Sequence, residues 1–251
     1  MYTLGLLIVM LVLLEVGRHV GARRMAKDPE GARSGVGAVD GAVFGLLGLL
    51  VAFTFSGAAS RFDSRRQLIV EETNNIGTAY LRLDLLAADA QVTLREVFRR
   101  YVDQRLEVYR KLPDVAAAYK ELARAEELQQ EIWRLAVNAS RAPGASPAAP
   151  VLLLPALNAM IDIGTTRTFA AQMHPPMIIF IMLFGLAMIS ALLAGYGMAG
   201  SKTRSWIHMV CFATVLAVAV YVILDIEYPR LGLIQVESFD QALIDLRKSM
   251  K

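Results

Sequence analysis

The fold of this chain is decided by residues 35–84, which read GVGAVDGAVFGLLGLLVAFTFSGAASRFDSRRQLIVEETNNIGTAYLRLD. Residues 36–59 form an apolar run long enough to cross a bilayer as a helix. The run then becomes polar without a proline, and Gly77 is the only glycine of the stretch after Gly57. We therefore predict one long helix that spans a membrane and continues into water.

The composition of the whole chain also predicts a membrane protein. Of its 251 residues 55% are hydrophobic, and the mean hydropathy is +0.45, which exceeds what a soluble domain needs. Besides residues 36–59, apolar runs cover residues 2–16, 177–200 and 207–224. The predicted fold class is all-α, with four spans, a long helical insertion between spans 2 and 3, and a second span that continues as one long helix.

Four regions follow from this pattern. Spans 1 and 2 occupy residues 1–60, an extramembrane helical domain residues 61–173, spans 3 and 4 residues 174–226, and an amphipathic tail residues 227–251. Polar connections are expected at residues 27–37, 141–150 and 201–204, and Pro175 and Pro176 should open the third span.

The insertion should contain three amphipathic helices after the long one. Two cover residues 89–112 and 115–140, and a third carries Leu154, Leu157, Ile161 and Gly164 at helical spacing. Asp114 is the expected N-cap of the middle helix. Each helix should be apolar on one face only, so the three must pack on one another or on a neighbouring subunit.

Small residues recur at helical spacing along the second span, at Gly41, Gly45, Gly48, Ala52, Ser56 and Ala59. Small residues allow helix backbones to approach closely in lipid. One interpretation is packing against another helix of the same subunit; the other is contact between the subunits of a symmetric ring. In the ring, Leu49 and Phe53, with Gly45, would form a hydrophobic constriction of a pore.

Charged residues at the ends of the spans have alternative interpretations. Arg61, Arg65 and Arg66 could attract anions at a vestibule, or pair with Asp63 or with phospholipid headgroups. We expect Asp40 to cap the start of the second span's helix. The carboxylates of Asp225 and Glu227 are expected at the membrane interface, as is usual for charges near span ends.

The sequence lacks the patterns of common catalytic and metal sites. A single cysteine, Cys211, excludes an intrachain disulfide, and the three histidines are far apart in the sequence. The glycines of GLLGLL lie in a span and are not followed by the Lys-Ser/Thr of a phosphate loop. The basic residues are dispersed. We therefore expect no enzyme activity, no cofactor, no metal and no nucleic-acid partner.

The positive-inside rule bears on orientation. The first connection holds Arg18, Arg23, Arg24, Lys27 and Arg33, and the third holds Lys202 and Arg204. Both connections should therefore be cytoplasmic, which places the helical insertion outside. Arg61, Arg65 and Arg66 favour the opposite orientation.

Two motifs carry a family resemblance that covers essentially the whole chain. The first comprises Glu72, Asn74 or Asn75, Ile76, Gly77, Tyr80 and Arg82, and the second comprises Leu224, Asp225, Pro229, Gly232, Ile234 and Val236. In both, the chain resembles the bacterial bestrophin-like membrane family, whose function is unknown. This resemblance implies a multi-pass protein of the bacterial cytoplasmic membrane.

A more distant resemblance links the chain to the bestrophins themselves. Phe53, Arg61 and Phe62 fall at corresponding spacings, whereas Thr54 and Asp63 depart from the pattern. The resemblance implies a pentameric anion channel whose second span lines a hydrophobic neck and whose helical region is cytoplasmic.

These observations lead to one main hypothesis, a homo-oligomeric membrane protein that conducts ions along the second span. A non-conducting scaffold or sensor that uses the helical insertion remains an alternative. An ion-driven stator-like protein is another, although it needs acidic groups deep in spans 3 and 4, where this sequence has none.

Overall fold

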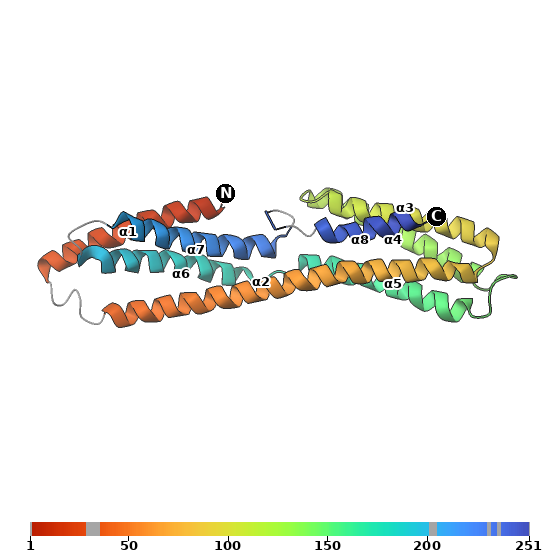
Figure 1. Cartoon of the computed structure of the whole chain (residues 1–251), viewed down its shortest axis with the longest axis horizontal. Coiled ribbons are helices and arrows are strands. Elements are labelled where there is room, and N and C mark those ends of the chain that lie inside the picture. Colours follow the sequence, from red (N-terminus) through yellow and green to blue (C-terminus); the bar gives the residue numbers. More distant parts are fainter. Residues whose placement is uncertain (1, 29–35, 201–204, 230–231, 235–236, 251) are drawn as a thin grey trace. The chain divides into compact units, whose positions relative to one another are not determined.

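The computed structural model describes residues 2–28, 36–200, 205–229, 232–234 and 237–250, and these residues contain helices but no strand. The elements, labelled in Figure 1, are α1 (Tyr2–Lys27), α2 (Val36–Leu81), the 3-10 helix η1 (Arg82–Leu85), α3 (Ala88–Arg110), α4 (Val115–Ala139), α5 (Ala149–Gln172), α6 (Met177–Gly197), the 3-10 helix η2 (Met198–Gly200), α7 (Trp206–Glu227) and α8 (Glu237–Ser249). The all-α class is confirmed. Most of the first predicted connection and all of residues 201–204, with Arg33, Lys202 and Arg204, lie outside the described residues.

The long second helix is confirmed. α2 runs without interruption for 46 residues, because no proline removes a backbone donor from its ladder. Four helical segments are long and apolar enough to span a membrane, and they cover Thr3–Lys27, Gly37–Leu85, Ala149–Gly200 and Trp206–Glu227. The four-span architecture predicted from the sequence is therefore confirmed.

Helix α5 differs from the sequence prediction of a single apolar face. Leu153 and Leu157 are fully buried, but Val151 and Phe169, on the opposite side of the helix, are 72% and 59% exposed. The reason is compositional, because apolar residues occupy both sides of α5. The apolar range Ala149–Gly200 therefore takes in α5 as well as α6, and α6 begins at Met177 directly after Pro176, as predicted.

The chain divides into two compact units. The first contains Met1–Ser60 and His174–Glu227, and α1 packs in it against α6 and α7. Its core is formed by apolar side chains of these helices, among them Met10, Leu14, Leu183, Ala187 and Val220.

Glycines bring α1 and α6 into close contact in the first unit. A Cβ atom added at Gly17 would lie 2.0 Å from the carbonyl oxygen of Leu192, and one added at Gly195 would lie 2.0 Å from that of Leu14. No side chain fits in that space, so both positions require glycine. This is the close backbone approach that small residues allow between membrane helices.

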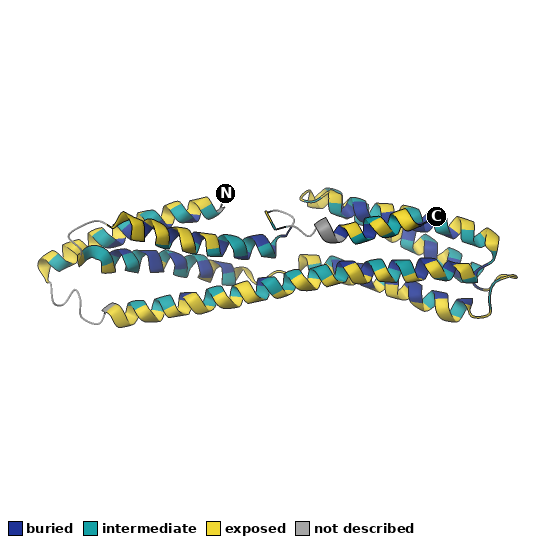
Figure 2. Ribbon diagram, in the orientation of Figure 1, coloured by how far each residue is buried: buried dark blue, intermediate teal, exposed yellow. Residues whose placement is uncertain are grey.

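The second unit contains Arg61–Met173 and Tyr228–Lys251. Residues of α2, η1, α3, α4, α5 and α8 share one hydrophobic core, which includes Ile76, Leu83, Phe98, Ile132 and Leu243. The predicted cap of α4 is confirmed, because the Asp114 carboxylate accepts a hydrogen bond of 3.0 Å from the backbone N–H of Ala117. Figure 2 colours the buried residues of these helices dark blue on the ribbon.

Candidate functional site

The part of α2 that belongs to the first unit is mostly uncovered. Leu47 and Ala58 are buried, whereas Leu49 is 53% and Phe53 is 68% exposed. The mainly yellow and teal first half of α2 in Figure 2 shows the same pattern. At about 100° per residue, Leu49 and Phe53 lie on the side of the helix opposite Leu47 and Ala58. A broad apolar face of this helix is therefore available for lipid or for another subunit.

The small-residue stripe lies on the same exposed side, next to Leu49 and Phe53. Five of its members, Gly41, Gly45, Gly48, Ala52 and Ser56, are exposed, and Ala59 is half-buried. A Cβ atom added at any of the three glycines would meet no atom within 4 Å. Within the described chain, then, no other helix packs closely on these glycines. The close intrachain contact uses Gly17 and Gly195 instead.

The basic residues after the span are engaged with their own unit. Arg65 donates from Nε to the carbonyl oxygen of Ala170 at 3.1 Å and from Nη2 to that of Met173 at 2.7 Å. These carbonyls lie at the C-terminal end of α5, where the helix itself supplies no donors. Arg66 pairs with Asp63 at 3.1 Å and lies over the Phe62 ring. Arg61 is half-buried and also has interactions.

Of the acidic residues near the spans, Asp40 is placed differently from the sequence expectation. Asp40 does not cap α2, because the helix already begins at Val36 and Asp40 lies one turn inside it. Asp225 and Glu227 are buried at the end of α7. Glu227 Oε1 lies 2.9 Å from Nδ1 of His174, so the two ends of the segment His174–Glu227 meet in the first unit.

A buried ionic network that the sequence analysis missed occupies the second unit. Glu72 on α2 bonds through Oε1 to Nε of Arg105 on α3 at 2.6 Å, and through Oε2 to Nη1 of Arg167 on α5. Arg167 Nη2 also donates to Asp240 Oδ1 on α8 at 2.9 Å. None of these four residues is more than 9% exposed. The Glu72 carboxylate thus joins α2, α3 and α5, and Arg167 extends the network to α8.

Two tyrosines complete this network. Arg105 Nη2 donates to the Tyr109 hydroxyl at 2.7 Å, and the Arg167 guanidinium lies 3.8 Å from the centre of the Tyr109 ring. Such a position over the ring face is favourable for a cation. Tyr101 accepts a hydrogen bond of 2.9 Å from Nε2 of Gln129, which brings α4 into the same polar cluster.

The electrostatics of the cluster keep its groups charged. Burial alone would raise the pKa of Glu72, but Arg105 and Arg167 outweigh burial and lower that pKa below its ordinary value of 4.5. Burial likewise lowers the pKa of both arginines, but their ionised partners raise it more. Burial raises the pKa of Tyr101 and Tyr109, so both phenols stay neutral. The cluster thus pairs two guanidinium groups with the carboxyl groups of Glu72 and Asp240 in the interior of the second unit.

The sequence contains a signal for this network. Glu72 falls in the apolar helical series Ile69, Ile76 and Leu83, and Arg105 falls in the series Phe98, Tyr101 and Val108. A charge at such a position must be buried with the core face, which requires an opposite charge nearby. Among the described residues, no group of three or more His, Cys, Asp or Glu side chains could hold a metal ion.

Comparisons with known proteins give two findings. Residues 4–239 match the family described as Bestrophin-like, with a Bestrophin-like domain. Among solved structures, the chain is similar to a single-substitution variant of a bacterial bestrophin homologue from Klebsiella pneumoniae. The TM-score is 0.72, the sequence identity is 14%, and the match covers 97% of this chain and 98% of that one. Curated protein sequences give no significant match.

Proposed function

Because the chain belongs to the Bestrophin-like family, we propose that this membrane protein is a homo-oligomeric, anion-conducting channel whose pore is lined by α2. The observation that carries the proposal is the uncovered face of α2, with Leu49 53% and Phe53 68% exposed beside glycines that no described helix contacts. In a pentamer, as in the bestrophins that the sequence resembles, one part of this face contacts the neighbouring subunit and another part faces the central axis.

The two parts of the exposed face have different roles in the proposal. The small residues Gly41, Gly48, Ala52, Ser56 and Ala59 contact the next subunit, where their size allows close approach. Gly45, Leu49 and Phe53 face the axis, and the two large apolar side chains form a constriction that controls conduction through dewetting.

The basic side chains after the span have an indirect role in the proposed conduction. Arg65 and Arg66 have partners within their own unit, so they contribute a positive potential to a vestibule rather than direct ion contacts. Inorganic anions are the proposed permeant species. The charge count of the connections supports an inner-membrane topology with the helical domain outside, and reporter fusions at residue 113 would test that side.

Planar bilayers with the purified protein test conduction. We expect anion-selective currents, and we expect Phe53→Ala to change the conductance because it removes an apolar ring from the constriction. Phe55→Ala is the matched control: Phe55 is 45% exposed in the same span but lies on another side of the helix. Silent bilayers with folded oligomers, or equal effects of the two substitutions, would refute the pore assignment.

A further inference from the structure

An open groove of about 440 Å³ follows one side of α1 in the first unit. The residues that line it recur every three or four positions, which places them on one face of the helix. They are Val12, Glu15, Val16, His19, Val20 and Arg23. The three valines are 56%, 44% and 52% exposed, whereas Met10 and Leu14 on the packed side of α1 are fully buried. Because α1 has the length and composition of a membrane span, this exposed face is turned to lipid.

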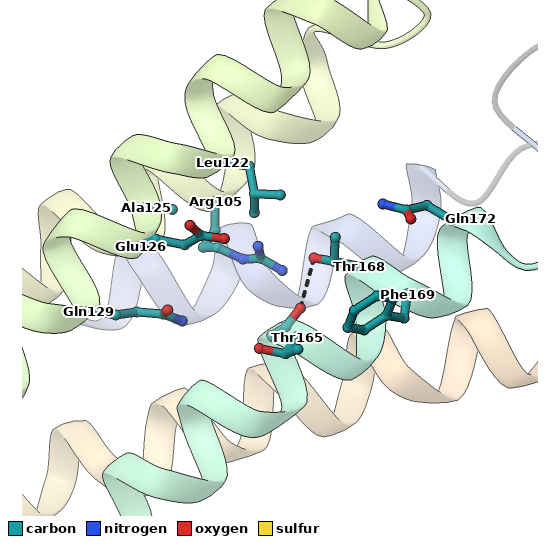
Figure 3. Close-up of a pocket in the computed structure, with 10 residues that line it drawn as sticks. Arg105, Leu122, Ala125, Glu126, Gln129, Thr165, Thr168, Phe169 and Gln172 are labelled. Atoms are coloured by element: carbon teal, nitrogen blue, oxygen red, sulfur yellow. Dashed lines mark hydrogen bonds between the residues drawn. The ribbon is translucent and has the colours of Figure 1, made fainter.

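The groove is separate from the ionic network of the second unit. That unit has a smaller cavity of about 180 Å³ between α3, α4 and α5, shown in Figure 3. The Arg105 guanidinium in the lining of this cavity already bonds to Glu72 and Tyr109, so the cavity is part of the network. The residues that line the groove on α1 all belong to the first unit.

The groove has the length of one leaflet of a bilayer. From Val12 to Arg23 the helix rises about 16 Å at roughly 1.5 Å per residue, which is close to half of the roughly 30 Å hydrocarbon core. The valines form the apolar part of the groove, and Arg23 lies at its other end, in the last two turns of α1. An acyl chain can therefore lie along the valines while its headgroup reaches Arg23.

The charge at the polar end favours an anionic headgroup. Between residues 18 and 28, one side chain is acidic, Asp28, and four are basic, namely Arg18, Arg23, Arg24 and Lys27. Basic residues at the end of a span attract anionic lipids, and a guanidinium binds a phosphate through two parallel hydrogen bonds. The ammonium group of a zwitterionic headgroup would be repelled by the same excess of cations.

The acidic residue of the lining does not change this preference. Glu15 lies eight positions before Arg23, which is about 12 Å along the helix axis. Its Oε1 atom lies 3.2 Å from Nδ1 of His19, one turn closer to Arg23. The carboxylate thus has a partner on α1 and is too far from Arg23 to pair with an ammonium group of a headgroup bound there.

We propose that the groove binds an anionic glycerophospholipid, with its phosphate on Arg23 and one acyl chain along Val12, Val16 and Val20. The occupant is a lipid rather than a free phosphate, because the exposed valines need an apolar partner. This inference goes beyond ion conduction, since it assigns a lipid site to α1, whereas the proposed pore residues lie on α2.

Native mass spectrometry of the full-length protein, released from detergent that contains the probe, tests the ligand class. The probes are phosphatidylglycerol, phosphatidylcholine with the same acyl chains, and glycerol 3-phosphate, which has the phosphate but no chain. We expect phosphatidylglycerol to bind at least about tenfold more tightly than either, because each of the others lacks one of the two matching parts. Equal binding of phosphatidylcholine or of glycerol 3-phosphate would overturn the proposal.

Substitutions on α1 test the location of the headgroup. Arg23→Gln should weaken the binding of phosphatidylglycerol about tenfold, because it removes a charge-assisted hydrogen bond to the phosphate. Arg24→Gln is the matched control: Arg24 is an exposed neighbour with the same charge that does not line the groove. It should weaken binding by no more than about threefold. Equal effects of the two substitutions would refute the assignment of Arg23.

A second pair of variants tests the location of the acyl chain without a change of charge. Val16→Trp should fill the groove and weaken the binding of phosphatidylglycerol. Ile8→Trp should not, because Ile8 is 54% exposed on α1 but lies outside the lining. Equal binding by the two variants would refute this groove as the lipid site. These measurements do not depend on whether the protein conducts.

Discussion

Glu72 and Arg105 form an ion pair of 2.6 Å between Oε1 and Nε, with side-chain exposures of 0% and 2%. Each charge is stabilised by the other and by further bonds to Arg167 and Tyr109. Removal of one partner would leave an uncompensated charge in the core, which is far more costly than the loss of a surface pair.

Glu72→Gln should destabilise the second unit by about 3–5 kcal/mol, because two buried guanidinium groups lose their shared anion. Denaturant unfolding of the detergent-purified protein would measure this. Glu71→Gln is the control, since Glu71 is exposed on the same turn of α2. Similar losses for both variants would show that the network does not contribute as described.

The same network predicts a loss of stability in acid. Because the folded-state pKa of Glu72 is lowered from 4.5, its contribution is fully present above pH 4.5 and is lost as the pH falls through the folded-state value. Unfolding of the wild-type protein should therefore become easier below pH 4.5. The Glu72→Gln variant should lack this component, so its unfolding free energy should change less over the same range. Parallel pH profiles would contradict the prediction.

Gly195→Ala should destabilise the first unit, since the new Cβ would lie 2.0 Å from the carbonyl oxygen of Leu14 and the helices would have to separate. Overpacking of this kind costs about 1–3 kcal/mol or more. Thermal unfolding in detergent measures the effect. Gly185→Ala is the matched control on α6, because a Cβ there meets nothing within 4 Å. A Gly195→Ala protein as stable as this control would be inconsistent with the close helix contact.

Gly48→Leu should leave the single chain folded, because a Cβ at this position meets no atom within 4 Å. If the stripe contacts a second subunit, the substitution should shift the protein to smaller assemblies in size-exclusion chromatography with light scattering. Ala42→Leu places the same leucine side chain at an exposed position outside the stripe and should have no such effect. If Gly48→Leu left the assembly size unchanged, the stripe would not be part of the subunit interface.

Asp240→Asn should loosen α8 from the second unit. Arg167 Nη2 donates to Asp240 at 2.9 Å, and Asp240 is only 9% exposed. Hydrogen exchange at the amides of residues 243–249 should become faster. Asp245→Asn, which alters an exposed pair with Lys248 at 3.4 Å, should have little effect. α8 also retains the Arg247–Asp103 pair and buried Leu243, so loosening rather than full release is expected.

The sequence was sufficient to predict the elements of the fold because their signals are local. The apolar run and the absence of proline predicted α2, and Asp114 followed by a helical pattern predicted the cap of α4. Asp40 was wrongly expected at a helix start, since the weakly patterned residues before it extend α2 backward to Val36.

The buried network could not be predicted as a network, because its members are distant in the sequence. Glu72 and Arg167 are separated by 95 positions, and Arg167 and Asp240 by 73. Helical periodicity places each charge on a core face but does not say which faces meet. The close helix contacts were missed for a similar reason: the pattern of Gly17 and Gly21 on α1 is much shorter than the stripe on α2, which has no partner in the described chain.

The glycine contact between α1 and α6 also has a consequence for biosynthesis. Gly17 and Gly195 are separated by 178 positions, from 195 minus 17, and the entire second-unit segment Arg61–Met173 lies between them. At about 5–20 residues per second, a ribosome needs roughly 10–35 s to make the intervening chain. During that interval α1 has no α6 against which to pack. The first helix to be made must therefore wait in the nascent protein for one of the last.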